Sequence, residues 1–210
     1  MTDRFEREPR WPALVAMLAA GCVYLALPEP LSVGPSWLLL AIVLVLLVPL
    51  TVSYRRGDHD VARILTFVAN GVITLALIAS LIFLIYGMAH HLNAAAALLR
   101  AASILWFTNI LVFALWYWKL DAGGPLKRER ATDRSDCDFL FPQMLTAEGR
   151  DSSWSPHFID YLFLAFNTST AFSPTDTAVL SRWAKLVTML QALISLTIVV
   201  LLASRAVNIL

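Results

Sequence analysis

Long apolar stretches separated by short polar segments are the dominant pattern of this chain. A helix needs about 20 mostly apolar residues to cross the hydrocarbon core of a bilayer, with a range of about 17–25. Five stretches reach that range: Trp11–Leu27, Trp37–Tyr54, Ala62–Met88, about Leu98–Trp118, and Trp183–Leu210. The pattern therefore predicts an all-α, polytopic membrane protein with five transmembrane helices. The first helix is the shortest, because the prolines of Pro28-Glu29-Pro30 end it.

A sixth apolar segment, Phe158–Phe166, is about half the length of a membrane span. Small and hydroxylated residues follow it, and non-helical backbone at membrane depth must be buried in protein or line water. We therefore predict a re-entrant, pore-type half-helix that runs into a filter-like loop. The loop residues are Thr168, Ser169, Thr170, Ala171, Phe172 and Ser173. Ser173-Pro174-Thr175-Asp176 has the composition of a helix start, so we expect the final helix to begin there.

These segments predict three regions. Residues 1–118 form a four-helix transmembrane region, residues 119–157 form a polar linker, and residues 158–210 hold the half-helix, the loop and the final helix. Within the linker, Gly123-Gly124-Pro125 predicts a turn, and the apolar patch Phe139–Met144 is expected to dock on the membrane face or on a neighbouring element.

Polar residues at the C-terminal end are the candidates for a functional site. Thr188, Gln191 and Ser195 follow helical spacing, so they share one face of the final helix. They either line water in an oligomer or form hydrogen bonds between helices. Asp160 and Asp176 flank the half-helix and the loop, where a carboxylate could attract a cation. For Asp176, the alternative is a carboxylate at the start of the final helix.

The linker carries charges of both signs, and we interpret it as a solvated segment. Asp133, Asp136 and Asp138 could be considered as metal ligands, but no glycine-containing calcium-loop spacing accompanies them. We therefore predict no metal ion and no cofactor. Cys22 and Cys137 form no zinc-type or disulfide pattern.

Composition supports lipid as the main solvent of the chain. Of its 210 residues, 59% are hydrophobic and 15% are charged, whereas soluble domains have about 45–50% apolar and about 25% charged residues. The mean hydropathy is +0.69. A net charge of +1 provides no electrostatic basis for binding nucleic acid.

The distribution of basic residues predicts the orientation. If the N-terminus is cytoplasmic, 14 of the 16 Lys and Arg residues lie on the cytoplasmic side, and Arg100 and Arg205 are the exceptions. We therefore expect the N-terminus and the linker to be cytoplasmic and the C-terminus to be outside.

Catalytic signatures are missing from the sequence. It has no Ser/His/Asp arrangement, glycine-rich phosphate loop or HExxH motif, so we predict that the protein is not an enzyme. No ionisable residue lies near the centre of a predicted span, which argues against proton-coupled transport.

The half-helix, the sequence Thr-Ser-Thr-Ala-Phe-Ser at 168–173 and the long final helix resemble the pore module of tetrameric potassium-channel-like cation channels. In the resemblance, Ser169 matches the filter threonine and Phe172 its aromatic residue, while Ala171 and Ser173 replace glycines. The resemblance implies a homo-oligomer, with a tetramer favoured, and a pathway for monovalent cations lined by backbone carbonyls.

The whole chain also looks like a bacterial family of multi-pass membrane proteins, with no activity to transfer. The features in common are Asp160-Tyr-Leu-Phe-Leu-Ala-Phe166 and Val207-Asn-Ile-Leu210. This likeness implies the bacterial inner membrane.

Two functional hypotheses follow. The first is a channel-like protein that conducts cations through a homo-oligomeric pore built from the C-terminal hairpin. The second is a non-conducting membrane scaffold or accessory subunit that binds a partner through its cytoplasmic linker. A facilitator for a small uncharged solute is a weaker third.

Overall fold

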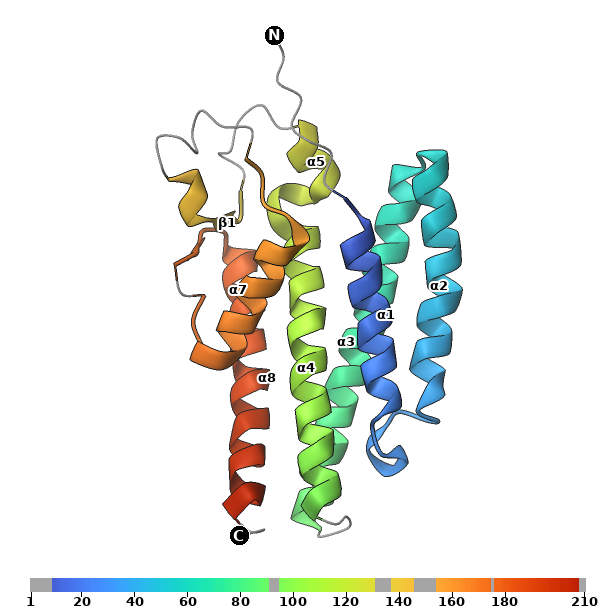
Figure 1. Cartoon of the computed structure of the whole chain (residues 1–210), viewed down its shortest axis with the longest axis vertical. Coiled ribbons are helices and arrows are strands. Elements are labelled where there is room, and N and C mark those ends of the chain that lie inside the picture. The colour runs from blue at the N-terminus through green and yellow to red at the C-terminus, as the bar shows by residue number, and fades with distance from the viewer. Residues whose placement is uncertain (1–8, 91–94, 131–136, 146–153, 175, 208–210) are drawn as a thin grey trace. The chain divides into compact units, whose positions relative to one another are not determined.

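The computed structural model describes residues 9–90, 95–130, 137–145, 154–174 and 176–207 (Figure 1). The chain is mainly helical, as expected. Its α-helices are α1 (Trp11–Leu25), α2 (Trp37–Arg56), α3 (His59–Ala89), α4 (Ala95–Leu120), α5 (Pro125–Arg130), α7 (Phe158–Ala171) and α8 (Arg182–Val207). Short 3₁₀ turns η1, η2 and η3 cover Glu29–Leu31, Asp121–Gly123 and Pro142–Met144, and two strands, β1 (Phe139–Leu140) and β2 (Ala178–Val179), form one antiparallel pair.

Four helical segments are long and apolar enough to cross a membrane, which is compatible with a multi-pass membrane protein. They are Trp37–Arg56, Asp60–Ala89, Ala96–Gly123 and Arg182–Ser204. The first predicted span forms the apolar helix α1, which has 15 residues. At about 1.5 Å per residue, α1 is shorter than the hydrocarbon core of about 30 Å.

Contacts divide the chain into two compact units. The first, here called the hairpin unit, comprises Met1–Ala13 and Phe113–Ser195. The second, here called the helical unit, comprises Leu14–Val112 and Leu196–Leu210. Residues of α1, α4 and α8 belong to both units.

In the helical unit, α2 and α3 pack along each other (Figure 1). The buried residues of α2 recur every three or four positions and so form one face: Leu39, Val43, Leu47 and Leu50. Gly57 ends α2 with φ +77°, in the left-handed region that glycine adopts without a steric penalty. The turn at Gly57 allows α3 to begin two residues later.

A buried tyrosine connects three elements of the same unit. The hydroxyl of Tyr24 in α1 lies 2.6 Å from the hydroxyl of Ser80 in α3. It also accepts a hydrogen bond of 3.0 Å from the backbone N–H of Val33, which follows η1. The phenol thus satisfies polar groups that lipid could not satisfy.

In the hairpin unit, α7 begins just after His157 and ends after 14 residues. The backbone N–H of His157 donates to Oδ2 of Asp160 at 2.7 Å, which caps the start of the helix. At the other end, Phe172 adopts a left-handed conformation with φ +54°, and the chain reverses there. Asp160 therefore has a local role at the helix start.

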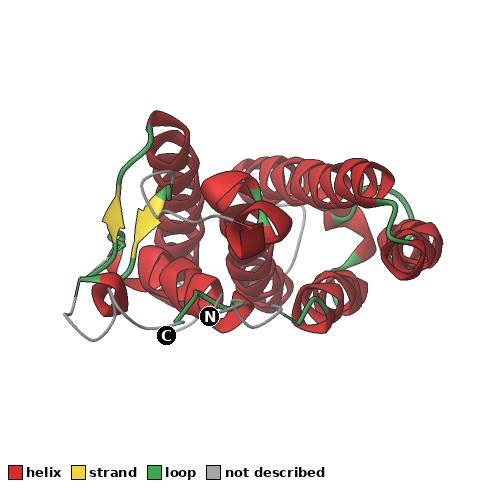
Figure 2. Ribbon diagram, turned by 90° about the horizontal axis from the view of Figure 1, so that it is seen from above, coloured by secondary structure: helices red, strands yellow, loops and turns green. Residues whose placement is uncertain are grey.

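After this reversal the chain returns to the beginning of α7. Strand β2 pairs with β1, with Val179 opposite Phe139, and the two strands lie side by side in Figure 2. The ring of Phe139 packs edge-on against that of Tyr161, near the start of α7, with centroids 6.4 Å apart. Helix, reversal and return limb therefore form a hairpin whose two ends lie together, and Figure 1 shows α8 then running in the same direction as α7.

The start of α8 agrees with the predicted span, which begins at Trp183, but not with the predicted helix start. We expected a helix to begin at Ser173–Asp176, but α8 begins at Arg182. The reason is the strand pairing, because Leu180 N–H also donates to the carbonyl of Asp138 at 2.8 Å. The helix can begin only after this segment, where Ser181 Oγ accepts from the N–H of Ala184 at 3.1 Å.

Candidate functional site at the hairpin

The predicted filter-like loop is largely helical. Thr168, Ser169, Thr170 and Ala171 form the last turn of α7, and only Phe172 and Ser173 lie beyond it. This corrects the prediction of non-helical backbone through 168–171. The physical reason is local: Thr168 and Thr170 donate their hydroxyls to carbonyls four residues earlier, at 2.9 and 3.0 Å, and so fit within the helix. The backbone of 168–171 is therefore a helical turn and not an extended filter loop.

The hydroxyls of the last turn are divided between two environments. Thr168 and Ser169 are buried, whereas Thr170, Ala171, Phe172 and Ser173 are exposed. We call the exposed group, 170–173, the hairpin tip. Phe172 keeps 43% of its surface exposed despite its size. The exposed carboxylate Asp176 follows the tip on the return limb.

Three helices meet through one buried polar network behind the tip. Gln191 of α8 is fully buried, and its Nε2 donates to the carbonyl of Ala165 at 2.7 Å and to Ser169 Oγ at 2.9 Å. Its Oε1 accepts a hydrogen bond from the hydroxyl of Tyr117 in α4. One turn further along α8, Ser195 Oγ donates to Ser169 Oγ at 2.9 Å. We call these residues the Gln191 network.

The predicted face of α8 is therefore real, but it is turned inward. Thr188, Gln191 and Ser195 are all buried within the chain, so they do not line an open surface. Thr188 donates its hydroxyl to the carbonyl of Ala184 in its own helix, at 2.8 Å. Of the two interpretations of this face, hydrogen bonding between helices is the one observed, through Gln191 and Ser195.

A second buried cluster lies at the base of the hairpin, around Asp121. This carboxylate is fully buried at the end of α4. Its Oδ1 accepts the N–H groups of Asp138, at 2.7 Å, and Phe139, at 3.2 Å, and its Oδ2 accepts the hydroxyl of Tyr161. One carboxylate thus joins the end of α4, strand β1 and helix α7. We call this group the Asp121 cluster.

Arg128 in α5 completes the Asp121 cluster. Its Nη1 lies 4.0 Å from Oδ2 of Asp121 and donates to the carbonyls of Trp118 and Asp121, each at 2.9 Å. The guanidinium also stacks over the Tyr161 ring, 5.1 Å from its centroid. A buried carboxylate is costly unless it is paired and hydrogen-bonded, and these contacts supply both.

The turn predicted at Gly123-Gly124-Pro125 brings Arg128 back to Asp121. Gly124 has φ +103° and ψ 169°, a conformation that is essentially restricted to glycine. The N–H of Ala122, just before the glycines, donates to Oδ2 of Asp138 at 3.1 Å. Asp138 thus has a structural hydrogen-bonding role. Asp133 and Asp136, the other two aspartates considered for metal binding, lie outside the described residues.

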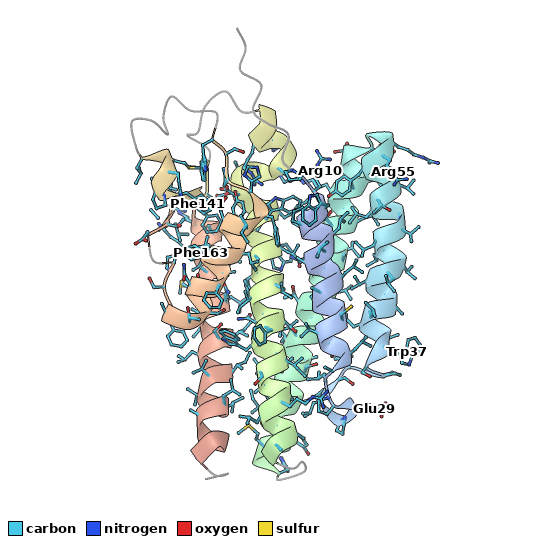
Figure 3. The ribbon with its side chains drawn as sticks, in the orientation of Figure 1. Arg10, Glu29, Trp37, Arg55, Phe141 and Phe163 are labelled. Carbon is cyan, nitrogen blue, oxygen red and sulfur yellow. The ribbon has the colours of Figure 1, made fainter. Side chains whose placement is uncertain are left out.

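The apolar patch of the linker docks on a neighbouring element, which is one of the two expected outcomes. Phe139, Phe141 and Met144 are buried. The ring of Phe141 packs edge-on against that of Tyr161, with centroids 5.4 Å apart. Figure 3 labels Phe163 on α7, which remains largely exposed. The Tyr161 side of α7 is therefore the packed side.

Asp121, Arg128, Tyr117 and Tyr161 were not among the predicted site residues. The prediction of a solvated linker is wrong for Asp121 and Arg128, because Asp121 is fully buried and the Arg128 side chain is 8% exposed. The sequence holds one signal: Asp121 lies three residues after the apolar stretch and two residues before Gly123-Gly124, so a tight turn could bring a partner to it. The tyrosines carried no distinguishing signal.

Comparisons with known proteins provide no relative. No protein-family model matches the chain, and no curated protein or solved structure matches it significantly.

Proposed function

We propose that this chain is a channel-like protein of the inner membrane, with a pore built in a homo-oligomer from the hairpin unit. The observation that carries the proposal is the hairpin itself: α7 advances 14 residues, the chain reverses at Phe172, and β2 returns to β1 beside the start of α7. A segment that turns back after about 20 Å would end near the middle of a bilayer about 30 Å thick.

A water-filled environment at the hairpin tip follows from backbone chemistry. The backbone leaves the helix at Phe172, where the chain reverses, so its polar groups beyond that point need partners other than a further turn of α7. Lipid cannot satisfy such groups, so they must face protein or water. In this proposal the exposed residues of the tip surround the constriction. Thr168 and Ser169, which are buried behind it, do not line it.

Electrostatics at the hairpin tip favours cations. The C-terminal end of a helix carries a partial negative charge of about half an elementary charge. The last turn of α7 has no basic residue that would neutralise it. The exposed carboxylate of Asp176 lies on the return limb. Monovalent cations are therefore the proposed permeant species.

The assembly is proposed to be a tetramer. Each chain contributes one hairpin, so a symmetric pore requires several copies around an axis. In the proposed arrangement α1 is the fifth span, because short apolar helices are accommodated by local bilayer thinning. The N-terminus and the linker are cytoplasmic and the C-terminus is outside, as the basic residues favour.

The test is cation flux from proteoliposomes combined with blocking of the tip. In a background with Cys22 and Cys137 replaced by alanine, Ser173→Cys is treated with a cationic methanethiosulfonate reagent. We expect a potassium flux that the reagent reduces strongly. Val33→Cys is the matched control, because Val33 is 42% exposed in the segment between α1 and α2 of the helical unit. Modification of Val33→Cys should leave the flux unchanged.

The alternative is a non-conducting scaffold or accessory subunit that binds a partner through its linker. An intact oligomer with no flux under several ionic gradients would contradict the channel and favour this alternative. A deletion that tests the linker must spare Arg128 and residues 137–145, because these are part of the hairpin unit. Deleting 131–136 leaves Arg128 and residues 137–145 in the chain.

A further inference from the structure

We infer that Gln191 is the positioning residue of the hairpin tip: it holds the last turn of α7 against α4 and α8 and so determines the geometry of the constriction. This inference rests on the proposed function for the meaning of the tip, but its geometry stands independently. Gln191 of α8 contacts Tyr117 of α4 and two residues of α7, so it joins all three helices.

Both the oxygen and the nitrogen of the Gln191 side-chain amide form hydrogen bonds. Oε1 accepts from Tyr117, and the two hydrogens of Nε2 go to Ala165 O and Ser169 Oγ, at 2.7 and 2.9 Å. A planar amide with one acceptor and two donors matches this set of partners. Leucine has a similar volume and would leave three buried polar groups without that partner. Glutamate would retain only the acceptor.

The two contacts on α7 restrain the residues that lead into the tip. Ala165 and Ser169 are one helical turn apart, so the amide fixes both the rotation and the height of α7. Ser169 lies three residues before Phe172, where the chain reverses. Ser195 holds Ser169 from α8 through a second contact of 2.9 Å. A shift of this turn must therefore move Phe172 and Ser173 with it.

This placement separates two functions along α7. The buried side of the last turn, at Thr168 and Ser169, provides attachment, and the exposed side, at 170–173, forms the surface of the constriction. A residue of α8 that touches only the attached side acts on conduction through α7. Gln191 therefore sets selectivity without contacting the ion.

The experiment measures the tip directly. In the full-length, cysteine-replaced protein in liposomes, the rate of modification of Ser173→Cys by a water-soluble thiol reagent is compared with and without Gln191→Leu. We expect the rate to change by at least about threefold, the effect of losing an interhelical hydrogen bond worth about 0.6 kcal/mol. We also expect the potassium-to-sodium permeability ratio to change. The modification rate of Val33→Cys, in the helical unit, should not change.

Ser80→Ala is the matched control for stability. Ser80 is as buried as Gln191 and its hydroxyl pairs with Tyr24 in the helical unit. Ser80→Ala should lower thermal stability in detergent but leave the Ser173→Cys rate and the permeability ratio unchanged. If Gln191→Leu does not yield folded protein, Tyr117→Phe takes its place. This change removes the donor to Oε1 of Gln191 together with the Tyr117 contacts to Thr168 and Thr188.

The inference would be overturned if folded Gln191→Leu left the modification rate of Ser173→Cys unchanged. The same holds for Tyr117→Phe where that variant takes its place. A changed rate with no current in any variant, the parent protein included, would support the positioning role and contradict the proposed channel. The two proposals therefore fail separately.

Discussion

Tyr161 donates its hydroxyl to the buried carboxylate of Asp121, a residue 40 positions earlier in the chain. Tyr161 lies in the first turn of α7, and Asp121 directly follows α4. The contact therefore attaches the start of α7 to the end of a candidate span. The same carboxylate accepts two N–H groups at the start of β1, which pairs with the return limb of the hairpin.

We expect Asp121→Asn to be strongly destabilising. The asparagine amide keeps the shape of the carboxylate but loses its charge. Its Nδ2 is a donor, and it would face donor groups that now bind to a carboxylate oxygen. Hydrogen bonds to a buried charge are worth about 1.5–3 kcal/mol each, so the free energy of unfolding should fall by about 3 kcal/mol. Denaturant unfolding in detergent measures it.

A double-mutant cycle with Tyr161→Phe tests the contact itself. If the two side chains interact as described, the double variant should be less destabilised than the sum of the single variants, by about 1–2 kcal/mol. Asp160→Asn, at the half-buried cap of α7, is the comparison and should cost only about 1 kcal/mol. Additive effects of Asp121→Asn and Tyr161→Phe would show that the contact carries no energy.

Gly124→Ala should destabilise the turn more than Gly57→Ala destabilises its own. Both glycines have positive φ, +103° and +77°. A Cβ at Gly124 would lie 3.1 Å from the backbone carbonyl of Lys119, whereas at Gly57 no atom lies within 4 Å. We expect a loss of about 1–2 kcal/mol at Gly57 and about 3 kcal/mol at Gly124. If thermal or denaturant unfolding showed the same loss of stability for Gly124→Ala and Gly57→Ala, the conformation assigned to the turn at Gly124 would be contradicted.

Ser181→Ala should lower stability by about 1 kcal/mol, because Ser181 Oγ accepts the N–H of Ala184 at the start of α8. Ser181→Asp should restore most of it, since a carboxylate also caps a helix. Ser204→Ala is the control: its exposed hydroxyl bonds within its own helix, to Leu201 O, so the change should stay within about 0.5 kcal/mol. If Ser181→Ala leaves the free energy of unfolding unchanged, Ser181 is not the cap of α8.

The proposed re-entrant arrangement predicts that both ends of the hairpin face the same side of the membrane. Single cysteines at Ser155 and Leu180, in the cysteine-replaced background, should react with an impermeant thiol reagent from the cytoplasmic side. Val33→Cys, between α1 and α2, should react from the opposite side. If Ser155→Cys and Leu180→Cys reacted from opposite sides, α7 and the return limb would be a full crossing.

Local sequence was sufficient to predict an all-α chain, where its long apolar helices lie and where α7 begins, but not that α7 continues to Ala171. The stretch Trp37–Tyr54 became α2 (Trp37–Arg56), and the half-helix begins at Phe158 as expected. The reason is that lipid acts on each segment separately: it requires a minimum apolar length and a backbone that satisfies its own hydrogen bonds. The face shared by Thr188, Gln191 and Ser195 also followed from helical spacing alone.

Tertiary structure decided where the polar side chains point and where the last helix begins. Gln191 faces Tyr117, 74 residues away, and Asp121 accepts from Asp138, 17 residues away. Pairing of β2 with β1 moved the start of α8 to Arg182. Such outcomes depend on which buried donor meets which buried acceptor, and neither partner's own neighbourhood in the sequence contains that information.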